Sequence, residues 1–196
     1  LAAGDVEDAT ELLRELLDER PDWLDAKALL AECLLKSGDA ATAEAMFHEV
    51  LARDPSHPVV LMALARSAQS RGEFVMAGDY AQRVLALGDT PEADRARRLA
   101  AYCARQLAEA ARLRRDFDQA FLYADLLFAY QAQTLDLLRF GAELARDAGR
   151  MAIAASRYRR LIVAYPDALE EGLQLSRCYP DPSEARKALT GLWQET

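Results

Sequence analysis

Few side chains in this sequence are of the types that carry out chemistry. The two histidines, His48 and His57, have no metal-ligating residue at helical spacing, so each is expected at the surface or at a helix cap. The three cysteines, Cys33, Cys103 and Cys178, lie far apart and form no Cys-x-x-Cys pair, which leaves neither a zinc site nor a disulfide framework. The sequence also has no glycine-rich phosphate loop and no Gly-x-Ser-x-Gly nucleophile motif. We therefore predict no catalytic, cofactor-binding or metal-binding residues, no cofactor, and a protein that is not an enzyme.

Charge and hydropathy narrow the classes of partner. The 196 residues carry a net charge of −8, and the first 57 of them hold 14 acidic and 5 basic side chains. Such an acidic segment repels phosphate groups, so nucleic acid is not expected as a partner. No stretch of about 18 residues is apolar and free of charge, so the sequence predicts no membrane insertion. The opening residues from Leu1 carry no secretory signal and indicate a segment of a longer chain.

The elements that would position any functional side chain follow a fixed period. A glycine followed by an acidic residue recurs every 34 residues, at Gly4, Gly38 and Gly72. Arg115 and Gly149 are again 34 residues apart, after an insertion of nine residues. The slots five, nine and twelve residues after each turn lie on one helix face and are filled by Ala9, Ala43, Ala77, Ala120 and Ala154, by Leu13, Phe47, Ala81, Ala124 and Tyr158, and by Leu16, Val50, Val84, Leu127 and Leu161.

A period of 34 residues with small residues at fixed slots resembles the tetratricopeptide repeat (TPR), which has a pair of antiparallel helices per unit. The leucine and small-residue slots of that family's first helix are filled by Leu30-Ala31, Leu64-Ala65, Leu107-Ala108, Gly141-Ala142 and Leu175-Ser176. The family's tryptophan is missing and its first-helix tyrosine remains only as Tyr179, so the array is of a degenerate bacterial type. The resemblance covers the whole chain. It implies an all-α fold, an α-solenoid of about five to six TPR-like helix-turn-helix repeats that forms a right-handed superhelix.

The array is predicted to have three parts. TPR repeats, the first of them partial, occupy residues 1–88. Residues 89–133 form a repeat with an extended, arginine-rich first helix, which begins after Thr90 and runs to about Arg114. Further repeats and a terminal helix occupy residues 134–196. The arginines of the extended helix either form a solvated flank or offer a docking edge to an acidic partner.

By the same resemblance, the first helices of the repeats would line a concave surface that binds a partner. The partner-binding candidates on it are Asp25, Glu32, Lys36, Val59, Met62, Arg66, Gln69, Tyr102, Arg105, Glu109, Asp136, Arg139, Glu143 and Arg146. The register places on the same surface Ala28, Leu35, Ser70, Arg112, Leu113 and Asp147. A mixed surface of this kind suits an extended peptide or a protein surface that carries charges of both signs.

Three functions are compatible with these observations. The first is a non-enzymatic protein–protein interaction scaffold, which binds a partner protein through the concave TPR surface within a larger bacterial assembly. The second follows from a resemblance to the periplasmic TPR segments of exopolysaccharide-export proteins, which recruit a polysaccharide-modifying enzyme or guide the glycan. The third is an accessory domain of an enzyme whose catalytic part lies elsewhere. A protein partner is expected in the first case and a glycan is an alternative in the second. The compartment stays open between bacterial periplasm and cytoplasm, and the export function favours the periplasm.

Overall fold

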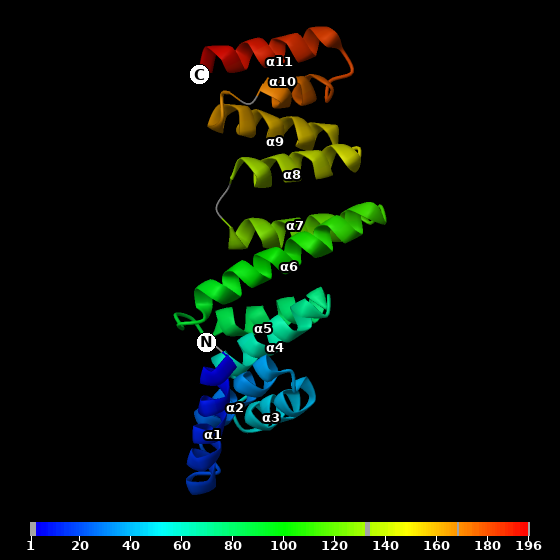
Figure 1. Cartoon of the computed structure of the whole chain (residues 1–196). Coiled ribbons are helices and arrows are strands. Elements are labelled where there is room, and N and C mark those ends of the chain that lie inside the picture. Colours follow the sequence, from blue (N-terminus) through cyan, green and yellow to red (C-terminus); the bar gives the residue numbers. More distant parts are fainter. Residues whose placement is uncertain (1–2, 132–133, 168, 196) are drawn as a thin grey trace. The chain divides into compact units, whose positions relative to one another are not determined.

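The computed structural model describes residues 3–131, 134–167 and 169–195, and every regular element in these ranges is a helix (Figure 1). The helices are α1 (Ala3–Glu19), α2 (Leu24–Ser37), α3 (Ala40–Arg53), α4 (Pro58–Ser70), α5 (Phe74–Ala86), α6 (Ala93–Leu113), α7 (Phe117–Tyr130), α8 (Leu135–Asp147), α9 (Met151–Ala164), α10 (Leu169–Ser176) and α11 (Pro182–Glu195). The predicted α-solenoid of helix-turn-helix repeats is thus confirmed. Across the described ranges, no helix has both the length and the apolar character needed to cross a membrane.

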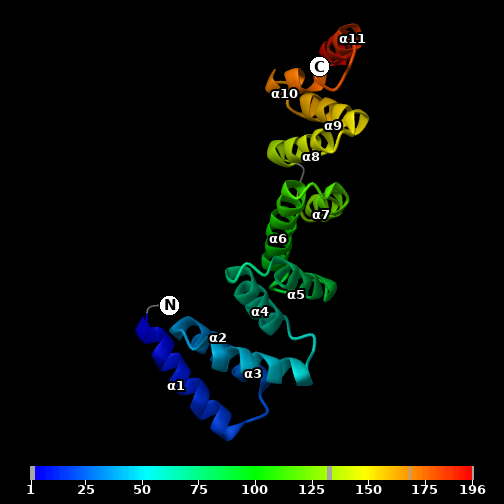
Figure 2. The same cartoon turned by 90° about the vertical axis from the view of Figure 1, so that its right-hand side faces the viewer.

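The chain divides into two compact units, Leu1–Cys103 and Ala104–Thr196, and the boundary between them falls inside α6. In the first unit α1 packs against α2, α2 against α3, and α4 against α5 (Figure 2). In the second unit α7 packs against α8, α8 against α9, and α10 against both α9 and α11. Each helix pair covers the apolar face of its neighbour, which is how stacked repeats bury a continuous core.

The predicted turns at Gly38, Gly72, Arg115 and Gly149 are confirmed by the backbone, but the one predicted at Gly4 is wrong, because Gly4 lies within α1. The slots that follow Gly4, Ala9, Leu13 and Leu16, are accordingly only half-buried. Gly38 ends α2 in the left-handed conformation, with a φ of 97°, and Asp39 then caps α3 by accepting a hydrogen bond from the Thr42 amide at 3.2 Å. Gly72 and Gly149 adopt the same region, with φ values of 76° and 71°. Glycine is favoured there because a Cβ atom would crowd the backbone. A left-handed turn therefore links the two helices of these repeats, and at Gly38 an aspartate that caps the second helix follows it.

The slots that follow each turn form the core, as the period predicts. The alanines five residues after the described turns are fully buried and allow close helix approach, namely Ala43, Ala77, Ala120 and Ala154. The residues nine positions after the turns are also buried, namely Phe47, Ala81, Ala124 and Tyr158. So are those twelve positions after the turns, namely Val50, Val84, Leu127 and Leu161. At Gly141 the approach is closest, because a Cβ there would lie 2.6 Å from the Phe128 Cζ atom.

The extended first helix is α6, which spans 21 residues, whereas α2, α4 and α8 span 14, 13 and 13. It begins at Ala93, three residues after Thr90, and ends at Leu113. The length follows from an uninterrupted run of helix-forming residues, mainly alanine, arginine and leucine. The limits predicted for the three parts of the array stay predictions.

Replacing Tyr158 by phenylalanine is expected to raise the free energy of unfolding by about 1 kcal/mol. The Tyr158 side chain is buried, and its hydroxyl has no hydrogen-bond partner among the described residues. Burial raises the pKa of this hydroxyl to about 12, so it stays neutral at ordinary pH. The substitution removes a desolvated polar group and keeps the ring packing. Urea unfolding tests this, with Tyr102→Phe, at an exposed tyrosine, as the control; a clear loss of stability in Tyr158→Phe would contradict it.

Candidate partner-binding site

In the first unit the predicted binding residues lie on α2 and α4, and their charges pair between the two helices. Arg66 of α4 donates from Nη2 to Glu32 Oε1 of α2 at 2.6 Å. Asp25 Oδ1 of α2 lies 3.2 Å from Nε2 of His57, the N-cap residue of α4. His48 is exposed, and His57 lies at a helix cap, as expected, although the His57 side chain is buried and makes no capping hydrogen bond. These charges hold neighbouring first helices together.

The other predicted residues of the first unit differ in exposure. Lys36 is exposed, and its ammonium has no ion pair within the described part of the chain. Val59 and Gln69 are half-buried, and Met62 is buried, with 5% of its surface exposed. Tyr102 is exposed and packs edge-on against a phenylalanine of α5, with 5.9 Å between the ring centroids. Their role in partner binding stays a prediction.

In the second unit, two predicted arginines of α8 also bond to the next first helix. Arg139 donates from Nε to Glu171 Oε1 of α10 at 2.6 Å. Arg146 donates from Nη1 to Gln174 Oε1 of α10 at 2.8 Å. Hydrogen bonds to a charged group of this length are strong. The two arginines therefore fasten α10 to α8, and part of their donor capacity is used inside the protein.

Most of the other predicted charged residues of this unit are also paired with a residue of the protein itself. Arg105 donates from Nε to Glu109 Oε1 along α6 at 3.1 Å. The Glu143 carboxylate of α8 lies 4.0 Å from the guanidinium of Arg112 on α6. Asp136, at the start of α8, is exposed. The predicted residues thus lie on the first helices of each unit as the register requires, and most of their charges are satisfied inside the protein.

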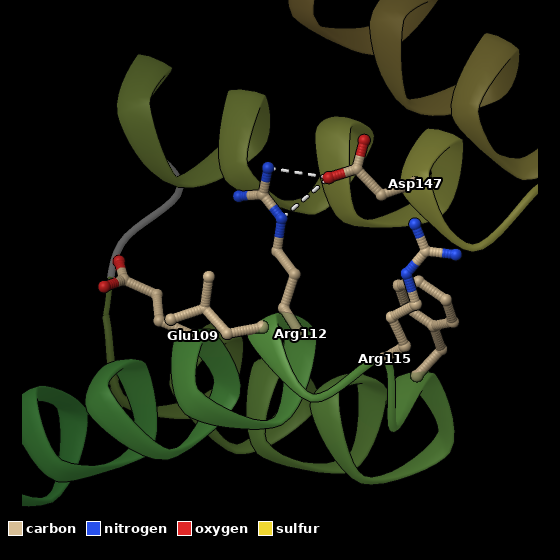
Figure 3. Close-up of a pocket in the computed structure, with 6 residues that line it drawn as sticks. Glu109, Arg112, Arg115 and Asp147 are labelled. Atoms are coloured by element: carbon tan, nitrogen blue, oxygen red, sulfur yellow. Dashed lines mark hydrogen bonds and ion pairs between the residues drawn. The ribbon is translucent and has the colours of Figure 1, made fainter.

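A groove of about 580 Å³ opens in the second unit, and we call it the α6–α8 groove (Figure 3). It is lined by residues from the end of α6, the turn that follows, the start of α7 and the end of α8, which are Glu109, Arg112, Leu113, Arg115, Phe117 and Asp147. Its walls are therefore a mixture of apolar and charged side chains.

One ion pair crosses this groove, and one cation in it is free. Figure 3 shows Arg112 reaching from α6 to Asp147 on α8, where Nε and Nη2 lie 2.7 and 2.6 Å from Asp147 Oδ2. The Arg115 guanidinium has no hydrogen bond or ion pair with any described residue. Leu113, two residues before it in the chain, also lines the groove and is 86% exposed. The α6–α8 groove therefore offers a partner one unneutralised cation and one exposed apolar side chain.

Sequence reasoning identified only part of this groove. The repeat register placed Glu109, Arg112, Leu113 and Asp147 on the binding surface, and all four line the groove. It missed Arg115 and Phe117, because these residues follow the helix and fall outside its face pattern. A signal was nevertheless present, since Arg115 occupies the turn position where the other repeats have glycine.

Replacing Arg115 by glycine is expected to increase the free energy of unfolding by about 1 kcal/mol. Arg115 has a φ of 60°, the left-handed conformation that the equivalent glycines adopt. A residue with a Cβ atom is strained there, and no hydrogen bond or ion pair of the Arg115 side chain with the described residues would be lost. Thermal unfolding tests this, with Arg114→Gly as the neighbouring control, for which no gain is expected. A lower melting temperature for Arg115→Gly than for the unaltered chain would contradict it.

Metal ligation and thiol chemistry find no support in the described residues. They contain no group of three or more His, Cys, Asp or Glu side chains that could hold a metal ion. Cys33, Cys103 and Cys178 are all buried. Burial raises the pKa of Cys103 to about 11 and also raises that of Cys178. These two thiols therefore stay protonated near neutral pH, whereas the reactive form is the thiolate.

Comparisons with known proteins agree with this architecture. The tetratricopeptide repeat family model matches residues 1–67 and 34–101. A tetratricopeptide repeat protein from Parabacteroides merdae is 15% identical, with 98% of this chain and 74% of that chain covered and a TM-score of 0.51. YrrB, described as a TPR protein with an unusual peptide-binding site, is 14% identical, with 93% and 89% covered and a TM-score of 0.51. No curated protein matches the sequence.

Proposed function

Because the chain belongs to the tetratricopeptide repeat family, we propose that it is a non-enzymatic scaffold that binds a segment of a partner protein on its first helices, within a larger bacterial assembly. Stacked repeats present extended surfaces, and such surfaces suit long, extended ligands. A similar fold in YrrB carries a peptide-binding site, which supports the same class of ligand here. The α6–α8 groove is the proposed centre of the site.

The observation that carries this proposal is the pairing of Leu113 with Arg115 in one groove. An exposed leucine alone is ordinary on a protein surface. Here the leucine is 86% exposed and lines a groove of about 580 Å³ that is also lined by Arg115, whose guanidinium has no ion pair with any described residue. Burying a leucine contributes about 2 kcal/mol, and a hydrogen bond to a charged group contributes about 2 kcal/mol. A partner segment with an apolar side chain beside a carboxylate satisfies both.

The charges that join neighbouring first helices are assigned a different role. Glu32 with Arg66, and Arg139 with Glu171, are already bonded to each other at 2.6 Å. A partner that used them would first have to break an internal bond, which lowers the net gain. We therefore assign them to holding the surface in shape. The alternative function in exopolysaccharide export, with its glycan and its periplasmic location, stays a prediction.

Site-specific photo-crosslinking tests the proposal. A photoreactive phenylalanine analogue is placed at Leu113 in the full chain, and the protein is irradiated in a lysate of the source organism. A matched probe is placed at Leu12, which is 58% exposed and lies on α1, away from the first helices. We expect partner peptides to be crosslinked at position 113 and to disappear when Arg115→Gly is added. Equal crosslinking at both positions, or crosslinking that Arg115→Gly leaves unchanged, would overturn the proposal.

A further inference from the structure

A second groove lies at the other end of α8. Its volume is about 570 Å³, and the residues that line it include Leu135, Arg139, Pro166, Asp167, Glu170 and Glu171; we call it the α8–α10 groove. Since α8 begins at Leu135 and ends at Asp147, this groove and the α6–α8 groove lie at opposite ends of one helix. Both belong to the same compact unit.

The α8–α10 groove carries an excess of negative charge. Its one cation, Arg139, is neutralised by Glu171, with Nε and Nη2 at 2.6 and 2.5 Å from Glu171 Oε1. Asp167 and Glu170 also line the groove, and both are exposed. Neither has an ion pair within the described part of the chain. Asp167 and Glu170 therefore remain without an ion pair among the described residues, beside the apolar side chains of Leu135 and Pro166, and Glu170 interacts with Arg139 only at longer range.

The charges that line the α6–α8 groove balance, with two carboxylates and two guanidiniums, but one of the cations is unpaired among the described residues. Arg105 holds the Glu109 carboxylate, and Arg112 holds that of Asp147. These pairs leave Arg115 as the uncompensated charge. The helix between the two grooves thus has a free cation at its end and free anions at its start.

We infer that the partner segment lies along α8 and carries charges of both signs, an acidic residue in the α6–α8 groove and a basic residue in the α8–α10 groove. This inference rests on the proposed function. The 13 residues of α8 span about 20 Å. An extended chain covers this distance in about six residues, at roughly 3.3 Å each. Arg115 follows α6, whereas Asp167 precedes α10 and Glu170 lies at its start, so the two contacts flank α8. The recognised segment therefore has its acidic and basic residues six or more positions apart.

The same arrangement excludes other segments. A segment that is acidic throughout would bring a carboxylate next to Asp167 and Glu170, and a segment that is basic throughout would bring a cation next to Arg115. Like charges at such a surface disfavour the wrong partner, and complementary ones select the right one. The loss of either charged contact is expected to weaken binding about tenfold.

Selection from a phage-displayed library of random peptides, with the full chain as bait, tests the inference. We expect the enriched peptides to share one acidic and one basic residue six or more positions apart. Selection with Arg115→Gly is expected to lose the preference for the acidic residue and to keep the preference for the basic one. Selection with the double variant Asp167→Asn, Glu170→Gln is expected to lose the preference for the basic residue and to keep the preference for the acidic one. The controls are Arg114→Ala and Glu184→Gln, which remove exposed charges outside both grooves and should leave the pattern unchanged.

The outcomes separate this inference from the proposed function. Enriched peptides that depend on Arg115 but carry no basic residue would overturn the inference and leave the proposed function standing. Enriched peptides that Arg115→Gly leaves unaffected, or a selection without enrichment, would overturn both. Because Arg115→Gly relieves backbone strain, lost binding in that variant is not a sign of an unfolded protein.

Discussion

Replacing Arg139 by leucine is expected to lower the free energy of unfolding by about 3 kcal/mol. The Glu171 side chain is 3% exposed and accepts its hydrogen bonds from this one guanidinium. That hydrogen bond also raises the pKa of Arg139. Without the arginine, a carboxylate is left in a buried position with no compensating charge. Urea unfolding followed by far-UV circular dichroism measures the change.

The double variant Arg139→Leu, Glu171→Leu is the matched control. An apolar pair of similar size removes both charges, and replacing a whole buried ion pair in this way is often neutral. The double variant is therefore expected to recover most of the stability that the single variant loses. If Arg139→Leu were as stable as the unaltered chain, Glu171 would not depend on its arginine, and the assigned role of this pair would be wrong.

Replacing Phe47 by alanine is expected to lower the free energy of unfolding of the first unit by about 4 kcal/mol. Phe47 is 0% exposed and lies on the face of α3 that packs on Leu30, Ala43 and Val60. A cavity the size of a phenyl ring would open there, and the surrounding helices collapse into such a space only in part. Hydrogen exchange of the α2 and α3 amides gives the local stability and is the measurement to make.

Leu12→Ala is the matched control for Phe47→Ala. Leu12 is 58% exposed on α1, so its removal leaves no cavity and is expected to cost less than about 0.5 kcal/mol. A similar loss of unfolding free energy in the two variants would show that the buried Phe47 side chain stabilises the first unit no more than the exposed Leu12 does. The expected difference between them follows directly from the burial of the slot nine residues after the turn.

The helical repeat could be predicted from the sequence because its signals are local. Gly38 and Gly72 mark turns that need a left-handed residue, and Ala43 and Phe47 follow them at offsets that share one helix face. Neither signal depends on how distant segments meet. Turn chemistry and hydrophobic periodicity together were therefore enough to place the helices and their buried faces.

The candidate site was less predictable because it depends on pairings between repeats. The register indicated which charges face the binding surface, but it did not indicate which of them the next repeat would neutralise. Glu32 and Arg66 occupy the same slot of consecutive repeats, 34 residues apart, so their opposite charges were a usable signal. Arg139 and Glu171 are 32 residues apart and pair through a small shift of register. Such shifts come from packing and cannot be derived from the period.

The ion pairs between first helices also affect the mechanics of the binding surface. Glu32–Arg66 in the first unit and Arg139–Glu171 in the second each join two successive first helices. Such bonds oppose the spreading of neighbouring repeats, so they set the bending stiffness of each unit. Dissolved salt screens partly exposed pairs over about 8 Å at physiological ionic strength. The compliance of the surface is therefore tied to the ionic composition of its surroundings, and rising salt softens it before any core contact is lost.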